Sequence, residues 1–290
     1  MEEKEQVELI NKDTDVIILL VDNKTFHTRE NSYDIKLFGN SMLGWIKFAV
    51  EGSKVKEVKA NLTDDVVSVI KPHLGDKKYT AVFYSDTPLL ERKTFLEIIE
   101  YVTVKGLSAL KLTRGYVFET EYLKTIDKIY NPQVAYFEEE DFIAAYNLKQ
   151  LGLVSDILKN RILSYHLKRG IRIIDTANTY IDSQVNIEEG VTIYPNNFIY
   201  GNSYIESGVT LKENNVIKDS YILEGATVSA SHIYNSIVGK KCEVGPFVVM
   251  KEESILEDNC KVGSFVDFKK GKLTKNSTVK HLSFIGREDL

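Results

Sequence analysis

The stretch IDSQVNIEEGVTIYPNNFIYGNSYIESGVTLKENNVI, residues 181–217, carries a branched or long aliphatic residue at every sixth position. A period of six matches neither the turn of an α-helix nor a strand that runs freely between turns. Short extended segments must therefore bend at regular intervals and return to one core. Hexapeptide repeats of this kind predict a parallel β-helix, in which three hexads form one coil and successive coils stack. The aliphatic positions are Ile181, Ile187, Ile193, Ile199, Ile205, Leu211 and Ile217.

The same period continues toward the end of the chain. It slips between residues 223 and 237, where SASHIYNS predicts an irregular coil or a bulge, and it resumes from Val238 to Phe268. After one shorter step it continues through Leu273, Val279 and Ile285. A β-helix is therefore expected over residues 171–290.

Residues one coil apart should lie above one another, separated by the roughly 4.8 Å between hydrogen-bonded strands. Several identities at this spacing support the stacking. Asparagine suits the corners, because it tolerates left-handed backbone angles and its amide can bond to the copy above. The stacked pairs are Asn196 with Asn214, Asn197 with Asn215, Cys242 with Cys260, Phe247 with Phe265, and Lys251 with Lys269.

Length and composition restrict the class of protein. With 290 residues, 43% of them hydrophobic, the chain has room for two domains with substantial cores. Its net charge of -5 argues against nucleic acid or an anionic membrane surface as the main partner. The longest apolar run, residues 16–21, is too short to span a bilayer, and the acidic start is unlike a signal peptide. A cytoplasmic protein is expected.

The two cysteines stack on adjacent predicted coils. At that distance Cys242 and Cys260 could form a disulfide. A cytoplasmic compartment favours the alternative, in which both are buried reduced thiols that act as small apolar residues.

Strand and helix patterns alternate in the first half of the chain. Alternation of this kind predicts a parallel sheet with helices on both faces. The sheet domain is expected over residues 1–139, and a linker helix over residues 140–170 joins it to the β-helix. Strands are expected at residues 14–21, 55–62, 79–86, 108–112 and 133–137, and helices at 63–75, with Thr63 as the N-cap, 91–104 and 115–130.

Asp86 stands at the carboxyl end of a predicted strand, the edge at which parallel sheets bind ligands. The position suits an aspartate that binds a metal ion or a hydroxyl group. It equally suits an aspartate that caps the turn at Thr87 and Pro88.

Segments of the second half resemble a known family, the bacterial bifunctional N-acetylglucosamine-1-phosphate uridyltransferase and glucosamine-1-phosphate acetyltransferase. These segments are IIDTANTYID (173–182), IYPNNFIYG (193–201), VGPFVV (244–249), VGSFVDFKK (262–270) and VKHLSFIG (279–286). In the first half, FGNSML, SDTPLL, RGYVF and AAYNLKQL resemble pieces of its uridyltransferase domain, in order.

The resemblance implies a fold and a set of ligands. The expected fold is a nucleotidyltransferase-like α/β domain followed by a left-handed β-helix of hexapeptide repeats. The resemblance further implies a homotrimer, a role in UDP-N-acetylglucosamine synthesis, and a sugar phosphate or nucleotide sugar as ligand. Acetyl-CoA and Mg²⁺ are the cofactors it implies.

The chain departs from the family in the first half. Family uridyltransferase domains carry the glycine-rich loop LAAGxGTRM after the first strand, and its amides bind the nucleotide phosphates. Residues 21–31 contain no glycine, and the family's segment for uracil and sugar is also absent. Asp86 and Asn147 keep the residue types that bind the metal in the family. These departures predict that uridyl transfer is lost and that the domain is kept for structure or another ligand.

Four residues of the second half match the acetyltransferase site of the family. His281 falls on the base that removes a proton from the amino group of glucosamine 1-phosphate, a role that suits an imidazole near neutral pH. Lys269 matches a lysine that binds the sugar phosphate. Lys251 replaces an arginine and so loses the bidentate fork, and Phe284 replaces a tyrosine and so loses a hydrogen-bond donor.

The residues themselves leave these roles open. Two stacked ammonium groups about 5 Å apart repel each other by roughly 1–3 kcal/mol, and an anion between them would relieve the repulsion. The alternative is a solvated face on which Glu252, Glu253 and Asp267 neutralise the lysines. Taken by itself, His281 fits an ordinary surface or packing histidine better than a base, and only the motif favours the catalytic role.

Family members continue for several more coils, which complete the acceptor site and the acetyl-CoA groove, whereas this sequence stops at Leu290. Three functions are therefore open. The first is a shortened homologue without uridyl transfer and with an incomplete acetyl-CoA site. The second is an active sugar-phosphate acetyltransferase or nucleotidyltransferase with altered loops. The third is a non-catalytic trimeric binding or scaffold protein.

Overall fold

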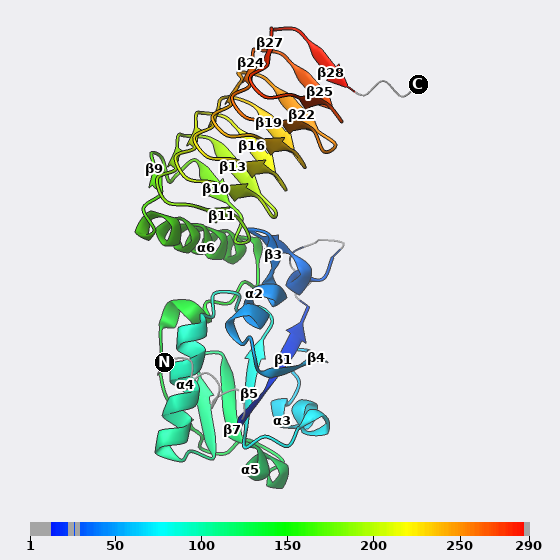
Figure 1. Cartoon of the computed structure of the whole chain (residues 1–290). Helices are drawn as coiled ribbons and strands as arrows, with labels where there is room; N and C mark the ends of the chain where they lie inside the picture. Colours follow the sequence, from blue (N-terminus) through cyan, green and yellow to red (C-terminus); the bar gives the residue numbers. More distant parts are fainter. Residues whose placement is uncertain (1–12, 23–25, 27–29, 287–290) are drawn as a thin grey trace. The chain divides into compact units, whose positions relative to one another are not determined.

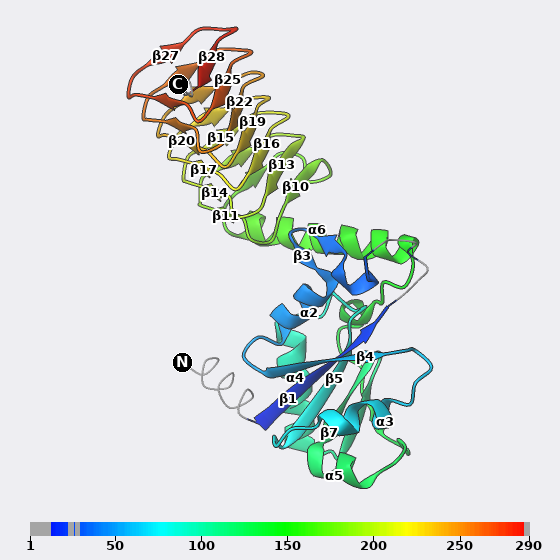
Figure 2. The ribbon, with the colours of Figure 1, turned by 90° about the vertical axis from the view of Figure 1, so that its right-hand side faces the viewer.

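The computed structural model describes residues 13–22, 26 and 30–286. The chain forms two compact units, residues 1–157 and 158–290, and each is described by itself (Figures 1 and 2). No helix in the described ranges combines the length and apolar character needed to cross a membrane.

The first unit is built on a six-stranded sheet in the order β4-β1-β5-β7-β6-β8. Successive side chains of β1 point to opposite faces, so Ile18 packs with α2 and α4 while Ile17 packs with α3 and α5. The prediction of helices on both faces is confirmed. The strands are β1 (Thr14–Val21), β4 (Lys54–Ala60), β5 (Tyr79–Tyr84), β6 (Ala109–Leu112), β7 (Gly115–Glu119) and β8 (Gln133–Val134). The helices are α2 (Met42–Ala49), α3 (Val66–Ile70), α4 (Arg92–Lys105) and α5 (Thr120–Thr125).

The sheet is mixed, so the prediction of a parallel sheet is wrong. β1 runs parallel to β4 and β5, whereas β7 runs antiparallel to both β5 and β6. The predicted helix over residues 115–130 is also wrong in its first part, because Val117 and Phe118 are fully buried in β7 and only α5 is helical. α3 begins after Asp65, whose carboxylate accepts the Ser68 N–H at 2.9 Å, and not at Thr63.

The second unit is a left-handed parallel β-helix that begins after α6 (Leu148–Lys168). Its strands form three parallel sheets, named here by their first strands. The β10 sheet contains β10 (Thr179–Ile181), β13 (Asn197–Tyr200), β16 (Val216–Lys218), β19 (His232–Tyr234), β22 (Val249–Lys251), β25 (Asp267–Lys269) and β28 (Phe284–Gly286). The β11 sheet contains β11 (Asn186–Ile187), β14 (Tyr204–Ile205), β17 (Tyr221–Ile222), β20 (Ile237–Val238), β23 (Ile255–Leu256) and β26 (Lys272–Leu273). The β9 sheet contains β9 (Arg172–Ile173), β12 (Thr192–Ile193), β15 (Thr210–Leu211), β18 (Thr227–Val228), β21 (Glu243–Val244), β24 (Lys261–Val262) and β27 (Thr278–Val279).

The hexads form the core of this unit, as predicted. Ile199 stacks on Ile181 and Ile217 on Ile199, and all three are buried. The predicted irregular coil is a shorter one: Val216 pairs with His232, 16 residues later, and His232 with Val249, 17 residues later, whereas Thr179 pairs with Asn197, 18 residues later. The frame slips there only because the corners are shorter, and the strands between them keep their places.

Asparagine ladders stabilise the corners, which confirms their predicted role. The Asn196 amide donates to Asn214 Oδ1 at 3.1 Å, and the Asn215 amide donates to Asn197 Oδ1 at 3.0 Å. Asn196 and Asn214 have φ values of 59° and 65°. That left-handed conformation costs an ordinary L-residue roughly 1–2 kcal/mol and asparagine less, because its short polar side chain bonds locally.

Cys242 and Cys260 are free and buried, and the Cys260 N–H donates to the Cys242 sulfur at 3.3 Å. Burial raises the pKa of the Cys242 thiol to about 11. The thiol is therefore protonated at neutral pH and is a poor nucleophile.

Candidate functional sites

Asp86 lies in the turn that follows β5, and its side chain is 3% exposed. Its carboxylate is paired with Arg114. Both carboxylate oxygens accept hydrogen bonds from one guanidinium: Arg114 Nε donates to Oδ1 at 2.7 Å and Nη2 donates to Oδ2 at 2.5 Å. This fork geometry is the strongest arrangement of the two groups.

Arg114 is placed by the turn between β6 and β7. The next residue, Gly115, has a φ of +140°, and a Cβ there would lie 2.6 Å from the Val82 carbonyl oxygen. Only glycine permits that approach of β7 to β5. The guanidinium also lies 4.4 Å from the ring centroid of Tyr84. Burial raises the pKa of Tyr84, and the charge of Arg114 opposes that rise in part.

Asn147 follows a segment that contacts Asp86: the Ala145 N–H donates to the Asp86 carbonyl oxygen at 2.7 Å. Its side-chain oxygen accepts the Gln150 N–H at 3.0 Å in the first turn of α6. The side-chain oxygens predicted to bind Mg²⁺ are therefore already bonded within the chain. Across the described residues, no three His, Cys, Asp or Glu side chains gather as a metal site. A Mg²⁺ ion at Asp86 would have to compete with the Arg114 guanidinium for both carboxylate oxygens.

The second predicted site lies on the outward face of the β10 sheet. Lys251 and Lys269 are in register on β22 and β25, so the two lysines stack as predicted. This pair is called the lysine column. Lys251 Nζ lies 3.5 Å from Asp267 Oδ2, and Lys269 Nζ lies 3.7 Å from Glu252 Oε1. All four side chains are partly exposed. The other oxygen of Asp267 is buried and has no hydrogen-bond partner.

His281 and Phe284 lie at the C-terminal end of the same face. Phe284 is on β28, in register with Asp267, and is exposed. His281 is exposed in the corner between β27 and β28. The sheet therefore gathers both lysines and Phe284 on one surface, with His281 at its border. Asp267 and Arg114 were not assigned to a site from the sequence, and the only signal for Arg114 was its place at the start of RGYVF.

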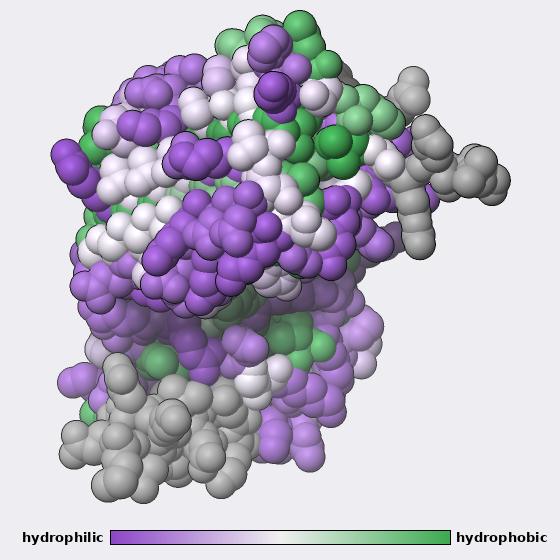
Figure 3. All heavy atoms as spheres, turned by 45° about the horizontal axis from the view of Figure 1, so that its top comes forward, coloured by the Kyte–Doolittle hydropathy of each residue, from purple (hydrophilic) through white to green (hydrophobic). Residues whose placement is uncertain are grey.

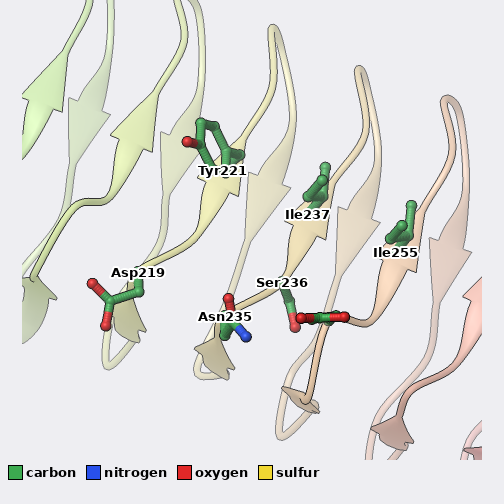
Figure 4. A pocket seen from close by; sticks show the side chains of 7 residues that line it. Asp219, Tyr221, Asn235, Ser236, Ile237 and Ile255 are labelled. Atoms are coloured by element: carbon green, nitrogen blue, oxygen red, sulfur yellow. The ribbon is translucent and has the colours of Figure 1, made fainter.

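A groove also runs along the corner between the β10 and β11 sheets (Figure 4). Figure 4 shows Tyr221, Ile237 and Ile255 side by side on successive strands, with Asp219 and Asn235 at the corner. The groove contains none of the predicted site residues. Its lining residues are Asp219, Tyr221, Asn235, Ser236, Ile237, Glu253 and Ile255.

Residues 176–286 match the family model described as the GMPPB C-terminal domain. The bifunctional protein GlmU of Clostridium novyi is 39% identical over 137 residues, which are 47% of this chain and 30% of that protein. The bifunctional protein GlmU of Clostridium perfringens (strain SM101 / Type A) is 38% identical over 166 residues, 57% of this chain and 36% of that protein. The solved structure of Rv0371c from Mycobacterium tuberculosis H37Rv has 9% identity and a TM-score of 0.38, covering 50% of this chain and 98% of that one.

The matched regions thus correspond to about a third of the length of these curated relatives. The family-model match, residues 176–286, lies within the hexapeptide β-helix. Over about half of its length, the chain is similar to these bifunctional GlmU proteins.

Proposed function

We propose that this GlmU-like chain binds a sugar phosphate at the lysine column of its β-helix and has lost metal-dependent uridyl transfer in its α/β unit. One observation carries the proposal: Asp86, the carboxylate expected to bind the metal, has both oxygens held by Arg114. A buried pair with fork geometry is costly to break, because separation leaves an uncompensated buried charge. The glycine-free segment that replaces the phosphate loop supports the same conclusion.

The ion pairs of the lysine column are weak, in contrast to the pair of Asp86 and Arg114. Pairs between partly exposed side chains contribute about 0–1 kcal/mol, so a phosphate that contacts both ammonium groups can displace the carboxylates at little cost. Lys251 and Lys269 supply two positive charges on adjacent strands, which suits a phosphomonoester dianion. The ligand class proposed is a hexosamine phosphate, as the family resemblance implies.

Two assays test this proposal. Incubation with UTP, Mg²⁺ and N-acetylglucosamine 1-phosphate should release no pyrophosphate, and steady turnover would overturn the loss of uridyl transfer. In calorimetry, glucosamine 1-phosphate should bind to the wild type and not to Lys251→Met/Lys269→Met. Lys261→Met is the matched control, because Lys261 is also exposed and paired, with Glu243 at 2.9 Å, but lies on the β9 sheet. Equal binding by all three proteins would refute the site.

Acetyl transfer to the bound amino sugar is the second candidate function. It is favoured by the position of His281 and Phe284 beside the lysine column at the end of the β10 sheet. In that role His281 would accept a proton from the amino group, whose nitrogen would form the amide bond while the C–S bond of the acetyl-CoA thioester breaks and coenzyme A leaves as the thiol. The test is thiol release from acetyl-CoA that requires glucosamine 1-phosphate and is lost in His281→Gln. No release above the His281→Gln background would limit the β-helix to binding.

The GlmU resemblance also implies a homotrimer, so self-association in the cytoplasm is part of the proposal. Light scattering on the purified chain is its direct test. A monomer at all concentrations would remove this part and leave the sugar-phosphate site unaffected.

A further inference from the structure

Aromatic side chains border the lysine column on both sides. β19, β22, β25 and β28 follow one another in the β10 sheet, and Phe284 on β28 lies beyond Lys269. β19 pairs in parallel with β22, so their third residues, Tyr234 and Lys251, lie side by side on the outward face. Figure 3 shows hydrophilic and hydrophobic residues next to one another on the surface at the C-terminal end of the β-helix. A ligand phosphate on the lysine column therefore has an aromatic side chain near it in both directions.

Tyr234 and His232 on β19 are called the aromatic pair. Their ring centroids lie 6.0 Å apart with an interplanar angle of 71°, and the Tyr234 hydroxyl lies 3.4 Å from His232 Nδ1. Tyr234 is partly exposed and His232 is exposed. A flat group that stacks on one ring lies at a steep angle to the other, and both arrangements of aromatic groups are favourable. The aromatic pair therefore favours a planar aromatic group as its ligand.

A third lysine extends the positive charge past the aromatic pair. Lys218 on β16 is in register with Tyr234 and is exposed. Unlike Lys251 and Lys269, it forms no ion pair with a described carboxylate. Its ammonium group can only donate hydrogen bonds, so a group bound here has to offer acceptor atoms. A nucleobase such as uracil offers both a face for stacking and carbonyl oxygens, whereas an alkyl chain offers neither.

We propose that the lysine column binds the diphosphate of a nucleotide-linked sugar, with the nucleobase on the aromatic pair and the sugar toward Phe284 and His281. The inference rests on the sugar-phosphate site proposed above and names a fuller ligand for it. A diphosphate bridge carries a negative charge on each of its phosphates, which suits one lysine for each. Such a ligand has a planar base at one end and a sugar at the other, and the lysine column has a different kind of neighbour on each side.

The spacing of the strands fits an elongated ligand of this kind. Successive strands of the β10 sheet are roughly 4.8 Å apart, so the four strands from β19 to β28 extend over about 14 Å. A single sugar phosphate on the lysine column covers only one of its two aromatic sides. With the sugar toward Phe284, it leaves the aromatic pair and Lys218 without a ligand, whereas an added nucleoside reaches them.

Calorimetry with two ligands that share one sugar tests the proposal. UDP-glucosamine should bind the wild type with a dissociation constant lower than that of glucosamine 1-phosphate by about tenfold or more, because stacking of the base adds to the affinity. Tyr234→Val should remove most of this advantage and leave the binding of glucosamine 1-phosphate unchanged. That retained binding also shows that the variant is folded, and valine already occupies outward positions of the same sheet at 216 and 249.

Two further variants make the test specific. Tyr234→Phe keeps the ring and should bind UDP-glucosamine as the wild type does. Tyr221→Val should do so too, because Tyr221 is an exposed aromatic residue on the β11 sheet. Equal dissociation constants of the wild type and Tyr234→Val for UDP-glucosamine would overturn the placement of the nucleobase and leave the sugar-phosphate site intact. Retained binding of both ligands by Lys251→Met/Lys269→Met would overturn the proposed function as well.

Discussion

In the α/β unit, a buried carboxylate is held by one guanidinium through two hydrogen bonds, whereas in the β-helix two partly exposed lysines reach carboxylates at 3.5 and 3.7 Å. The same kinds of charge therefore differ in how easily a ligand can displace their partners. The burial of Asp86 and the fork geometry make the first pair costly to separate, and solvent exposure leaves the second pair exchangeable. A residue can therefore match the type found in a related protein and still be unavailable to a ligand, because another residue of the chain holds it.

The largest expected effect comes from breaking the buried pair. Arg114→Met should lower the free energy of unfolding by about 3–5 kcal/mol, because the Asp86 carboxylate is left buried without a counterion. Urea denaturation followed by circular dichroism measures the change. The control Arg114→Met/Asp86→Asn should regain most of the loss, since the unpaired charge is gone. A loss below about 1 kcal/mol in the single variant would show that the pair is not held as described.

The same variant tests whether Arg114 excludes a metal ion. Once the guanidinium is removed, Mg²⁺ should raise the melting temperature of Arg114→Met, because a cation that binds only the folded state stabilises it. The wild type should show no such shift. A Mg²⁺-dependent shift in the wild type would contradict the proposal that its metal position is blocked.

The next prediction concerns how the free energy of unfolding depends on pH through His166, which lies near the C-terminal end of α6. His166 is 2% exposed, its Nδ1 is buried without a partner, and burial together with Arg169 lowers its pKa to about 4. The folded state therefore binds a proton more weakly than the unfolded state does. Stability is complete above the ordinary histidine pKa near 6.5 and falls as the pH drops toward 4, by about 3 kcal/mol for this residue.

Urea denaturation of the wild type and of His166→Gln at several pH values between 4 and 7 measures this loss. The difference in unfolding free energy between the two proteins should shrink as the pH falls, because glutamine does not titrate in this range. A constant difference would show that His166 does not cause the pH dependence.

More of the β-helix than of the α/β unit could be predicted from the sequence. The hexads and the asparagine ladders are local patterns, because a stacked partner is always one coil away, and Asn197 and Asn215 bond as expected. The pair of Asp86 and Arg114 joins residues 28 positions apart whose contact depends on the order of the strands. No local pattern contains that order. The strand β7 was itself predicted as the start of a helix, because the apolar residues of 115–130 follow a helical spacing.

A smaller effect should follow from interrupting the buried ladder. Asn215 Oδ1 accepts the Ser231 N–H at 2.9 Å inside the β-helix. Asn215→Ala should lower the free energy of unfolding by about 1–3 kcal/mol, because a buried N–H loses its acceptor. Thermal unfolding measures the loss, and Asn214→Ala at the exposed neighbouring ladder is the control with the smaller expected change. Equal losses in both variants would refute the importance of burial.

The smallest effect should come from the exposed pair of Lys251 and Asp267, and it tests the comparison from the other side. Lys251→Met should change the free energy of unfolding by less than about 1 kcal/mol, because the two side chains are solvated whether paired or not. The same substitution should nevertheless weaken the binding of glucosamine 1-phosphate in calorimetry, with a smaller residual affinity at high salt, where screening weakens the remaining charge of Lys269. Arg114 would then be required for stability and would block a ligand, whereas Lys251 would be required for ligand binding and not for stability. A loss of stability in Lys251→Met as large as in Arg114→Met would show that the lysine column is structural and would remove the reason to assign it a ligand.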